Sequence, residues 1–112
     1  IIKIKRKLFE TYHQAFKSLN GVEIMKEHQN TKSNYWLITL LLRKELIDSG
    51  AINKDEILNL AHECGLLLRP LWKPLNLLKM YKDSPSGVLE KSNQIEKRLI
   101  NLPSSPKLLK NE

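Results

Sequence analysis

Cysteine is nearly absent from this sequence: Cys64 is the single one in 112 residues. One cysteine excludes an internal disulfide and a zinc cluster built from cysteines. Cys64 falls within a helical pattern, so we expect a buried and unreactive thiol. This cysteine usage is typical of a cytoplasmic protein.

Long hydrophobic runs are also missing, and the longest apolar stretch is far too short to cross a bilayer. Residues 1–7 carry four basic side chains and lack the apolar core and the small-residue cleavage site of a signal peptide. The chain begins with Ile1 rather than methionine, and we expect it to be processed or cut from a longer protein.

Acidic residues are in the minority, since 19 lysines and arginines stand against 12 acids and leave a net charge of +7. Such an excess raises nucleic acid as a partner. The excess is split among residues 1–20, 66–82 and 91–112, however, and the sequence has no nucleic-acid-reading motif and no glycine-rich phosphate loop. We expect a solvated basic surface and no nucleic-acid partner, with a stand-alone module that binds a polyanion as the alternative.

Apolar residues make up 41% of the chain, and their spacing along it is that of helices in some segments and of strands in others. Apolar side chains at three- and four-residue steps predict a helix over residues 4–19, ended by Asn20-Gly21. Residues 22–25 alternate as a short strand. The apolar run at 35–42 predicts a strand that is buried on both faces.

The second half of the chain predicts two more helices and one more strand. Asn53-Lys54-Asp55-Glu56 has the form of a capping box for a helix that Gly65 ends. Residues 66–68 predict a strand that stops at Arg69-Pro70, because proline cannot donate to a ladder. A last helix is expected over 88–100. The buried stripe of the capped helix is expected to consist of Ile57, Leu58, Leu60, Ala61 and Cys64.

The predicted order is therefore helix, strand, strand, helix, strand, helix. This order predicts an α/β fold over residues 1–106, a small two-layer sandwich in which a short sheet is covered by about three helices. If the strands at 35–42 and 66–68 pair in parallel, their crossover is expected to be right-handed. Residues 107–112 are expected to form a frayed tail.

No residues are spaced as a catalytic set or as metal ligands. His13, His28 and His62 match no metal motif, and we expect each of them at or near the surface. The serines include no nucleophile elbow. The chain therefore predicts neither a catalytic residue nor a metal site of its own.

Two segments carry chemistry that is unusual for plain surface. Ser33-Asn34-Tyr35-Trp36 places polar groups and two aromatic rings at the start of a predicted strand. Residues 69–76, stiffened by two prolines, present polar groups at low entropic cost, and a guanidinium suits a carboxylate or a phosphate. The alternative is that Trp72 packs on the core while Arg69 and Lys73 are merely solvated. The candidate substrate-binding residues are Asn34, Tyr35, Arg69, Trp72, Lys73 and Asn76.

Four strings resemble the DegT/StrS-type sugar-nucleotide aminotransferases, which depend on pyridoxal phosphate (PLP). They are Ser-Asn-Tyr-Trp-Leu-Ile-Thr-Leu-Leu-Leu at 33–42, Arg-Pro-Leu-Trp-Lys-Pro-Leu at 69–75, Met-Tyr-Lys-Asp at 80–83 and Asn-Leu-Pro-Ser-Ser at 101–105. They occur in the family's order, and the match covers nearly the whole chain. The chain is most similar to members that aminate C4 of UDP-linked 4-keto-6-deoxy-N-acetylhexosamines.

This resemblance implies the small C-terminal domain of a fold-type I aminotransferase, usually a homodimer, that makes nucleotide sugars for surface polysaccharides with glutamate as the usual amino donor. It also implies that PLP is held by a large N-terminal domain, which carries the Schiff-base lysine, so that Lys73 is not that lysine and the fragment alone is inactive. The first helix, near Tyr12 and Phe16, is expected to face the large domain.

The chain departs from the family at three places: Asn76 stands where members often have histidine, Lys79 where they often have proline, and Ser84-Pro85 where they have Cys-Pro. Asparagine has no titratable group, so we expect Asn76 to hydrogen-bond a sugar hydroxyl. A third hypothesis is a structural or interaction domain that descends from this family but does not have its enzymatic activity.

The isolated 112-residue chain should form no specific covalent adduct with PLP and should catalyse no transamination, because the resemblance places the Schiff-base lysine in the large domain. Borohydride reduction followed by mass spectrometry measures the adduct. A stoichiometric adduct on one particular lysine would contradict this expectation.

Overall fold

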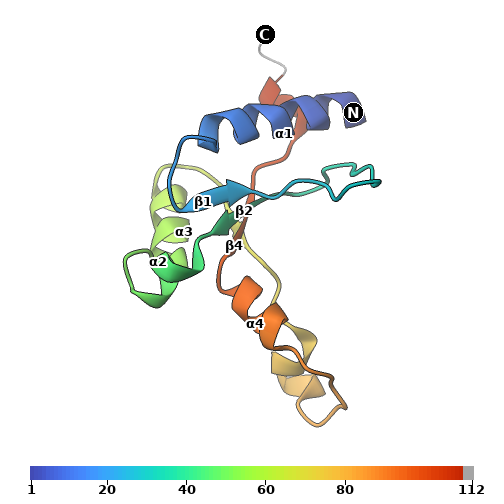
Figure 1. Cartoon of the computed structure of the whole chain (residues 1–112), viewed down its shortest axis with the longest axis vertical. Coiled ribbons are helices and arrows are strands. Elements are labelled where there is room, and N and C mark those ends of the chain that lie inside the picture. Colours follow the sequence, from blue (N-terminus) through green and yellow to red (C-terminus); the bar gives the residue numbers. More distant parts are fainter. Residues whose placement is uncertain (110–112) are drawn as a thin grey trace.

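A four-stranded antiparallel sheet in the order β1-β2-β4-β3 organises residues 1–109, the part of the chain that the computed structural model describes (Figure 1). The fold is a small α/β fold, as predicted. The strands are β1 (Val22–Ile24), β2 (Ile38–Leu42), β3 (Arg69–Pro70) and β4 (Leu99–Leu102). The helices are α1 (Ile2–Phe16), α2 (Lys44–Asp48), α3 (Lys54–Glu63) and α4 (Glu90–Glu96), with 3-10 turns at Leu75–Leu77, Lys79–Tyr81 and Pro106–Leu109.

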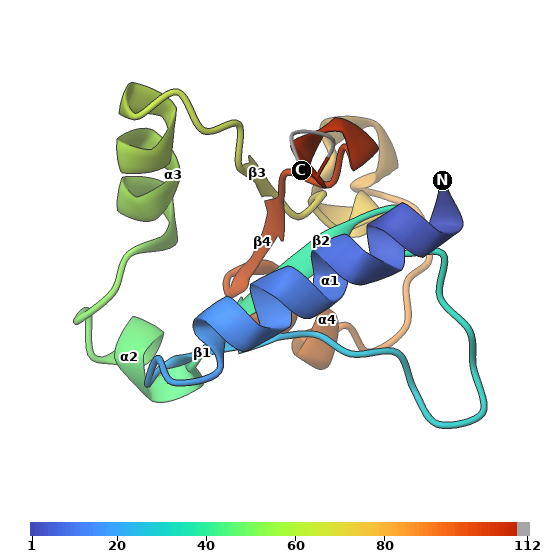
Figure 2. The same cartoon turned by 90° about the horizontal axis from the view of Figure 1, so that it is seen from above.

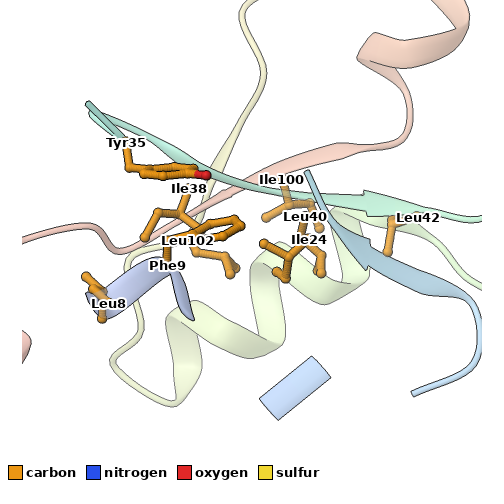
Figure 3. Close-up of a cluster of buried hydrophobic side chains, with 9 residues drawn as sticks. All are labelled: Leu8, Phe9, Ile24, Tyr35, Ile38, Leu40, Leu42, Ile100 and Leu102. Carbon is orange, nitrogen blue, oxygen red and sulfur yellow. The ribbon is translucent and has the colours of Figure 1, made fainter. Parts of the chain in front are cut away.

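The core lies between one face of the sheet and α1, which crosses that face (Figure 2). Figure 3 shows the buried side chains of β1, β2 and β4 gathered with Leu8 and Phe9 of α1. Burial alternates along β2, with Ile38, Leu40 and Leu42 buried and the residues between them half-buried. The prediction that this strand is buried on both faces is therefore wrong, and its second face is available to other groups.

The strand predicted at 35–42 starts late, at Ile38, because the backbone turns at Tyr35. Tyr35 has a φ of 47°, in the left-handed region that a strand cannot use. The carbonyls of Tyr35 and Trp36 accept hydrogen bonds from Lys5 Nζ instead of from a neighbouring strand. This turn buries the ring of Tyr35 and leaves Trp36 exposed.

Strand β4 is the element that the sequence analysis missed. It was predicted as the end of a helix over 88–100, but α4 ends at Glu96 and β4 follows, paired with β2 on one side and β3 on the other. Leu99 and Ile100 are both apolar, so the strand does not begin with the alternation that marks a half-buried strand. Because β4 separates β2 from β3, the parallel pairing of those two strands does not occur.

The third predicted strand was placed too early, at 66–68, whereas β3 consists of Arg69 and Pro70. Proline is tolerated there because β3 lies at the edge of the sheet and pairs only with β4. Leu68, just before the strand, packs against the core instead of pairing.

Asn53 caps α3, as predicted: its Oδ1 accepts hydrogen bonds from the backbone N–H of Asp55 at 2.9 Å and of Glu56 at 3.4 Å. The buried stripe of α3 is narrower than predicted, since Leu60 is 61% exposed and Cys64 is exposed. The prediction of a buried thiol is wrong. Cys64 follows the last residue of α3, whereas the residues of this helix that pack against the core, Ile57 and Leu58, lie in its first half.

Helix α2 was not predicted, and Gly21 makes room for it. Gly21 has a φ of +92°, and a Cβ placed on it would meet Leu46 Cδ1 of α2 at 2.2 Å. The positive φ therefore favours glycine at this turn, and a larger residue would also displace the end of the Leu46 side chain.

Helix α1 and the last described residues, 106–109, both contact the core. Tyr12 and Phe16 of α1 are half-buried against it, and the expectation that this helix faces the large domain stays a prediction. Residues 106–109 form a 3-10 turn whose Leu109 also contacts the core, where a frayed tail was expected. The rest of that predicted tail, 110–112, lies outside the described residues.

Residues 71–89 and α4 project from the sheet on the side away from α1, which gives the molecule its longest extent of 51 Å (Figure 1). This projection carries much exposed apolar surface, including Leu75 at 67% and Met80 at 74%.

Replacing Ile100 by alanine should lower the free energy of unfolding by about 2–5 kcal/mol, because Ile100 is fully buried at the centre of the sheet and its loss leaves a cavity. Urea denaturation measures the change. Val88→Ala, at a position that is 96% exposed, is the control and should change stability by less than about 0.5 kcal/mol. Equal effects of the two changes would contradict the assignment of Ile100 to the core.

Candidate functional site

A row of polar side chains crosses the second face of the sheet. Thr39 of β2 is opposite Asn101 of β4, and Asn101 is opposite Arg69 of β3. Directly opposed residues of antiparallel strands share a face, so all three lie on the face that α1 does not cover. Thr39 Oγ1 donates to Asn101 Oδ1 at 3.2 Å, and Asn101 Nδ2 donates to the carbonyl of Pro70 at 3.5 Å. The buried amide of Asn101 thereby fixes the start of the loop that follows Arg69.

Two exposed indoles meet at the end of this row. Trp36 precedes β2 and Trp72 follows β3, yet their ring centroids are 6.2 Å apart with an interplanar angle of 43°. Trp36 is 65% and Trp72 is 70% exposed. The two segments with unusual chemistry, 33–36 and 69–76, therefore come together in the structure, through Trp36 of the first and Trp72 of the second.

A cavity of about 300 Å³ lies beside the two rings. The polar residues of its lining are Arg69, Asn101 and Ser104. No aspartate or glutamate lines it, and no ion pair joins Arg69 to a carboxylate among residues 1–109. The rest of the lining consists of Trp36, Leu37, Leu67, Pro70, Trp72, Leu102 and Pro103. Such a cavity offers flat faces and the charge of Arg69, which has no carboxylate partner in the described part of the chain.

Lys5 of α1 holds the wall of this cavity that contains Trp36. Its Nζ donates to the carbonyls of Tyr35 at 3.3 Å, Trp36 at 3.2 Å and Ser104 at 2.8 Å. The hydroxyl of Ser104 also donates to the carbonyl of Trp36 at 2.7 Å. These bonds join the segment before β2 to the segment after β4, so the position of Trp36 depends on both.

The loop leading to Trp36 is tied to α1 by Arg6 and Glu27. Arg6 Nη1 donates to Glu27 Oε2 at 3.1 Å and to the carbonyl of Ser33 at 2.8 Å, and Glu27 Oε2 accepts from Ser33 N at 2.6 Å. The bond with Arg6, followed by that from Ser33, lowers the pKa of the Glu27 carboxyl. The bond with Glu27 raises the pKa of Arg6.

The six predicted site residues do not form one group. Tyr35 belongs to the core: it is 5% exposed and stacks on Phe9 with centroids 4.1 Å apart, and burial raises the pKa of its hydroxyl. Asn34 is exposed and uses its Oδ1 to accept from Trp36 N at 2.9 Å, which shapes the turn. Neither lines the cavity, whereas Arg69 and Trp72 both do.

Lys73 and Asn76 border other hollows. Lys73 is exposed and lines a cavity of about 610 Å³ at the start of α3. Asn76 lines a mostly apolar cavity of about 670 Å³ between residues 71–89 and α4, which Trp72 also borders. Its Oδ1 is buried and accepts no hydrogen bond from the residues that the structure describes.

The sequence analysis did not propose Trp36, Asn101 or Ser104 as site residues. Trp36 belongs to the segment 33–36, but the apolar residues that follow it predicted a buried strand. Asn101 and Ser104 belong to the string at 101–105, which indicated the family and not a site. A polar residue between Ile100 and Leu102 was the available signal, since a buried amide needs hydrogen-bond partners nearby.

Metal and membrane features give no further site. Within residues 1–109, no group of three His, Cys, Asp or Glu side chains is placed to hold a metal ion. None of the helices in this part of the chain is long and apolar enough to span a membrane.

Comparison with known proteins then decides the family. The sequence profile of the DegT/DnrJ/EryC1/StrS aminotransferase family matches residues 1–112. The chain belongs to this family. It is 32% identical, over 99% of its length, to EpsN of Bacillus subtilis (strain 168), which is named as a putative pyridoxal phosphate-dependent aminotransferase. Its likeness to GDP-perosamine synthase of Vibrio cholerae is 30% identity over 96% of the chain.

The chain spans 28% of the length of each of these two relatives. Among solved structures, it superposes on Helicobacter pylori PseC, an aminotransferase involved in the biosynthesis of pseudoaminic acid, with a TM-score of 0.78. That match has 18% identity and covers 96% of this chain and 28% of PseC. At this identity the match establishes the fold, which is that of a part of a fold-type I aminotransferase.

Acid should weaken the unmodified chain more than its Glu27→Gln variant. The pKa of Glu27 lies below its ordinary value of 4.5 in the folded chain, so its contribution to stability is complete above about that pH. The contribution is lost as the pH falls through the lowered pKa. The difference in free energy of unfolding between the two proteins should therefore shrink below pH 4.5, which urea denaturation at a series of pH values measures.

The matched control is Glu63→Gln, which removes an exposed acid of α3. Its stability should follow that of the unmodified chain throughout the same pH series. A difference between the Glu27→Gln variant and the unmodified chain that does not depend on pH would show that the bond with Arg6 does not hold the loop.

Proposed function

We propose that the full protein containing this chain is a PLP-dependent aminotransferase that transfers an amino group, from glutamate, to a nucleotide-linked 4-keto-sugar in polysaccharide or glycan biosynthesis. Family membership over residues 1–112 supports the reaction class. The likeness to a synthase named for a GDP-linked sugar supports the substrate class. Within that class we favour a UDP-linked 4-keto-6-deoxy-N-acetylhexosamine, on the motifs at 33–42 and 69–75.

Arg69 is the observation that carries the substrate side of this proposal. It lies on a cavity with no acidic lining residue and makes no ion pair with a carboxylate among residues 1–109. Its backbone is held in β3 and followed at once by a proline, so the side chain leaves a fixed point. A planar and permanently charged fork complements a diphosphate or a carboxylate.

In this proposal the chain binds and positions the substrate and supplies no catalytic residue. Trp72 borders both the 300 Å³ cavity and the 670 Å³ cavity, so it offers ring faces on either side of the loop. Asn76 lines the larger of these cavities, and a side-chain amide suits a sugar hydroxyl as donor and acceptor. Lys73 lies outside both cavities, and we give it no contact with the reacting atoms.

The cavity at Lys73 does not fit a PLP site. Lys73 is exposed, and its cavity contains Lys54 together with Glu96. Lys54 Nζ is engaged by the Glu96 carboxylate at 3.3 Å and by the Glu96 carbonyl at 2.8 Å. These groups form an ion pair instead of a cradle of free donors for a phosphate. We therefore assign the cofactor lysine and the phosphate cradle to a large N-terminal domain.

The partners that we propose are this large domain and a second copy of the full-length enzyme. The chain's 28% share of its relatives' length supports the first. The exposed apolar residues of the projection at 71–89 support further packing partners. We also propose a cytoplasmic location, which the single cysteine favours.

Replacing Arg69 by alanine in the full-length enzyme should raise KM for one substrate about ten- to a hundredfold, because a charge-assisted contact is lost. Arg69→Lys should recover only part of this loss, since an ammonium lacks the planar fork. Steady-state kinetics with each substrate varied in turn measures the effect.

The matched control is Arg43→Ala, which removes an exposed arginine at the start of α2 that does not line this cavity. It should leave both KM values within about twofold, as expected for a surface change away from the site. Unchanged kinetics of the Arg69→Ala enzyme together with a lowered melting temperature would assign Arg69 to structure instead.

A further inference from the structure

We propose that Lys5 is a positioning residue of the candidate site: its ammonium fixes Trp36 against Trp72, and this pair forms the aromatic wall of the cavity at Arg69. Lys5 does not line the cavity itself, so it acts through the backbone that it holds. The inference deepens the proposed function and rests on it for its kinetic consequence.

The segment around Trp36 lies before the sheet begins. The ladder between β2 and β4 starts at Ile38, which pairs with Leu102. Tyr35 has a left-handed φ of 47°, a conformation that is costly for a residue with a side chain and persists only where the surroundings support it. The carbonyls of Tyr35 and Trp36 therefore take their hydrogen bonds from outside the sheet.

The ammonium of Lys5 supplies the donors for these carbonyls. Its Nζ donates to the carbonyl of Tyr35 at 3.3 Å, to that of Trp36 at 3.2 Å and to that of Ser104 at 2.8 Å. An ammonium has three N–H donors and no acceptor, so three carbonyls match its full capacity. Within residues 1–109 no carboxylate pairs with Lys5, and these carbonyls are the groups that hold its charge.

Packing fixes the ring of Tyr35 but not the indole of Trp36. Figure 3 shows the Tyr35 ring among the core side chains, where it stacks on Phe9. Trp36 is 65% exposed, and the indole that it meets, Trp72, is itself 70% exposed. The place of the Trp36 ring therefore follows from its backbone, which the bonds from Lys5 Nζ and from Ser104 Oγ hold.

The next residue of α1, Arg6, has a different task. It binds Glu27 and the carbonyl of Ser33, so it holds the earlier part of the same loop. Lys5 instead reaches two residues of the cavity lining, Trp36 and Ser104. Loss of its ammonium should therefore loosen the aromatic wall while Arg6 still ties the loop to α1.

The aromatic wall reports its own geometry, because Trp36 and Trp72 are the two tryptophans of the chain. Indoles whose centroids are 6.2 Å apart couple and give a circular-dichroism couplet, which is isolated by comparison with the Trp36→Phe and Trp72→Phe variants. The folded Lys5→Met variant should lose most of this couplet. The control Lys3→Met, which removes an exposed lysine of the same helix, should keep it. A couplet that Lys5→Met retains in full, or that the unmodified folded chain lacks, would overturn the proposal.

Chemical rescue separates the charge of Lys5 from the packing of its side chain. In a Cys64→Ser background, which removes the one native thiol, Lys5→Cys offers a single thiol for alkylation in urea before refolding. Bromoethylamine rebuilds an ammonium at nearly the length of lysine, whereas iodopropane adds a neutral chain of similar length. The couplet should return after the first treatment and not after the second. The same couplet after both treatments would contradict a role for the ammonium.

In the full-length enzyme, Lys5→Met should raise the same KM that Arg69→Ala raises, but only about three- to tenfold, because the wall is displaced while Arg69 remains. The kcat should stay within about twofold, since Lys5 is not placed at the reacting atoms. Lys5→Arg, which keeps the charge and the donors, should recover part of the loss, and Lys3→Met should change neither value. A lowered melting temperature with an unchanged KM would make Lys5 a purely structural residue and end the proposal.

The role of Lys5 and the function can fail separately. If the full-length protein aminates a nucleotide keto-sugar while Lys5→Met changes neither the couplet nor the KM, the role of Lys5 is wrong and the proposed function stands. If the couplet depends on the ammonium while the full-length protein transfers no amino group to a nucleotide sugar, the function is wrong and the positioning of Trp36 stands.

Discussion

The pairing of β4 between β2 and β3 is the constraint on which the rest of the structure depends. All four residues of β4 are buried, since the strand has a neighbour on each side and side chains against both faces. Its core face carries Ile100 and Leu102, which α1 covers. Its other face carries Asn101, whose amide bridges Thr39 to the loop after Arg69. One short strand thus supports the core with one face and the candidate site with the other.

Much of this fold could be predicted from local patterns, because the elements concerned are long or clearly punctuated. The apolar spacing of α1 and the Asn53 cap of α3 are properties of consecutive residues, and both were predicted within a few positions. Arg69 and Trp72 were also found locally, because proline stiffens a loop that presents a charge and a ring. The family strings then indicated a fold that the described structure has.

The remaining features could not be predicted because they depend on contacts between distant residues. The four residues of β4 continue a helical spacing, and pairing with two strands overrides it. Tyr35 was assigned to the site by composition, but the left-handed backbone at that residue turns its ring onto Phe9. Trp36 then takes the exposed position, and its meeting with Trp72 depends on the order of strands in the sheet. A single sequence does not reveal such an order.

The bond between Lys5 and the carbonyl of Ser104 spans 99 residues of chain. Helix α1 and the segment after β4 are therefore walls of one structure, and this hydrogen bond forms only when both are in place. During synthesis the first helix leaves the ribosome long before its partner. Its apolar face is therefore not fully covered until β4 has emerged. The cavity is complete only when Ser104 has also emerged. Contacts of such long range also slow folding, because the closing of the loop precedes the stabilisation that it allows.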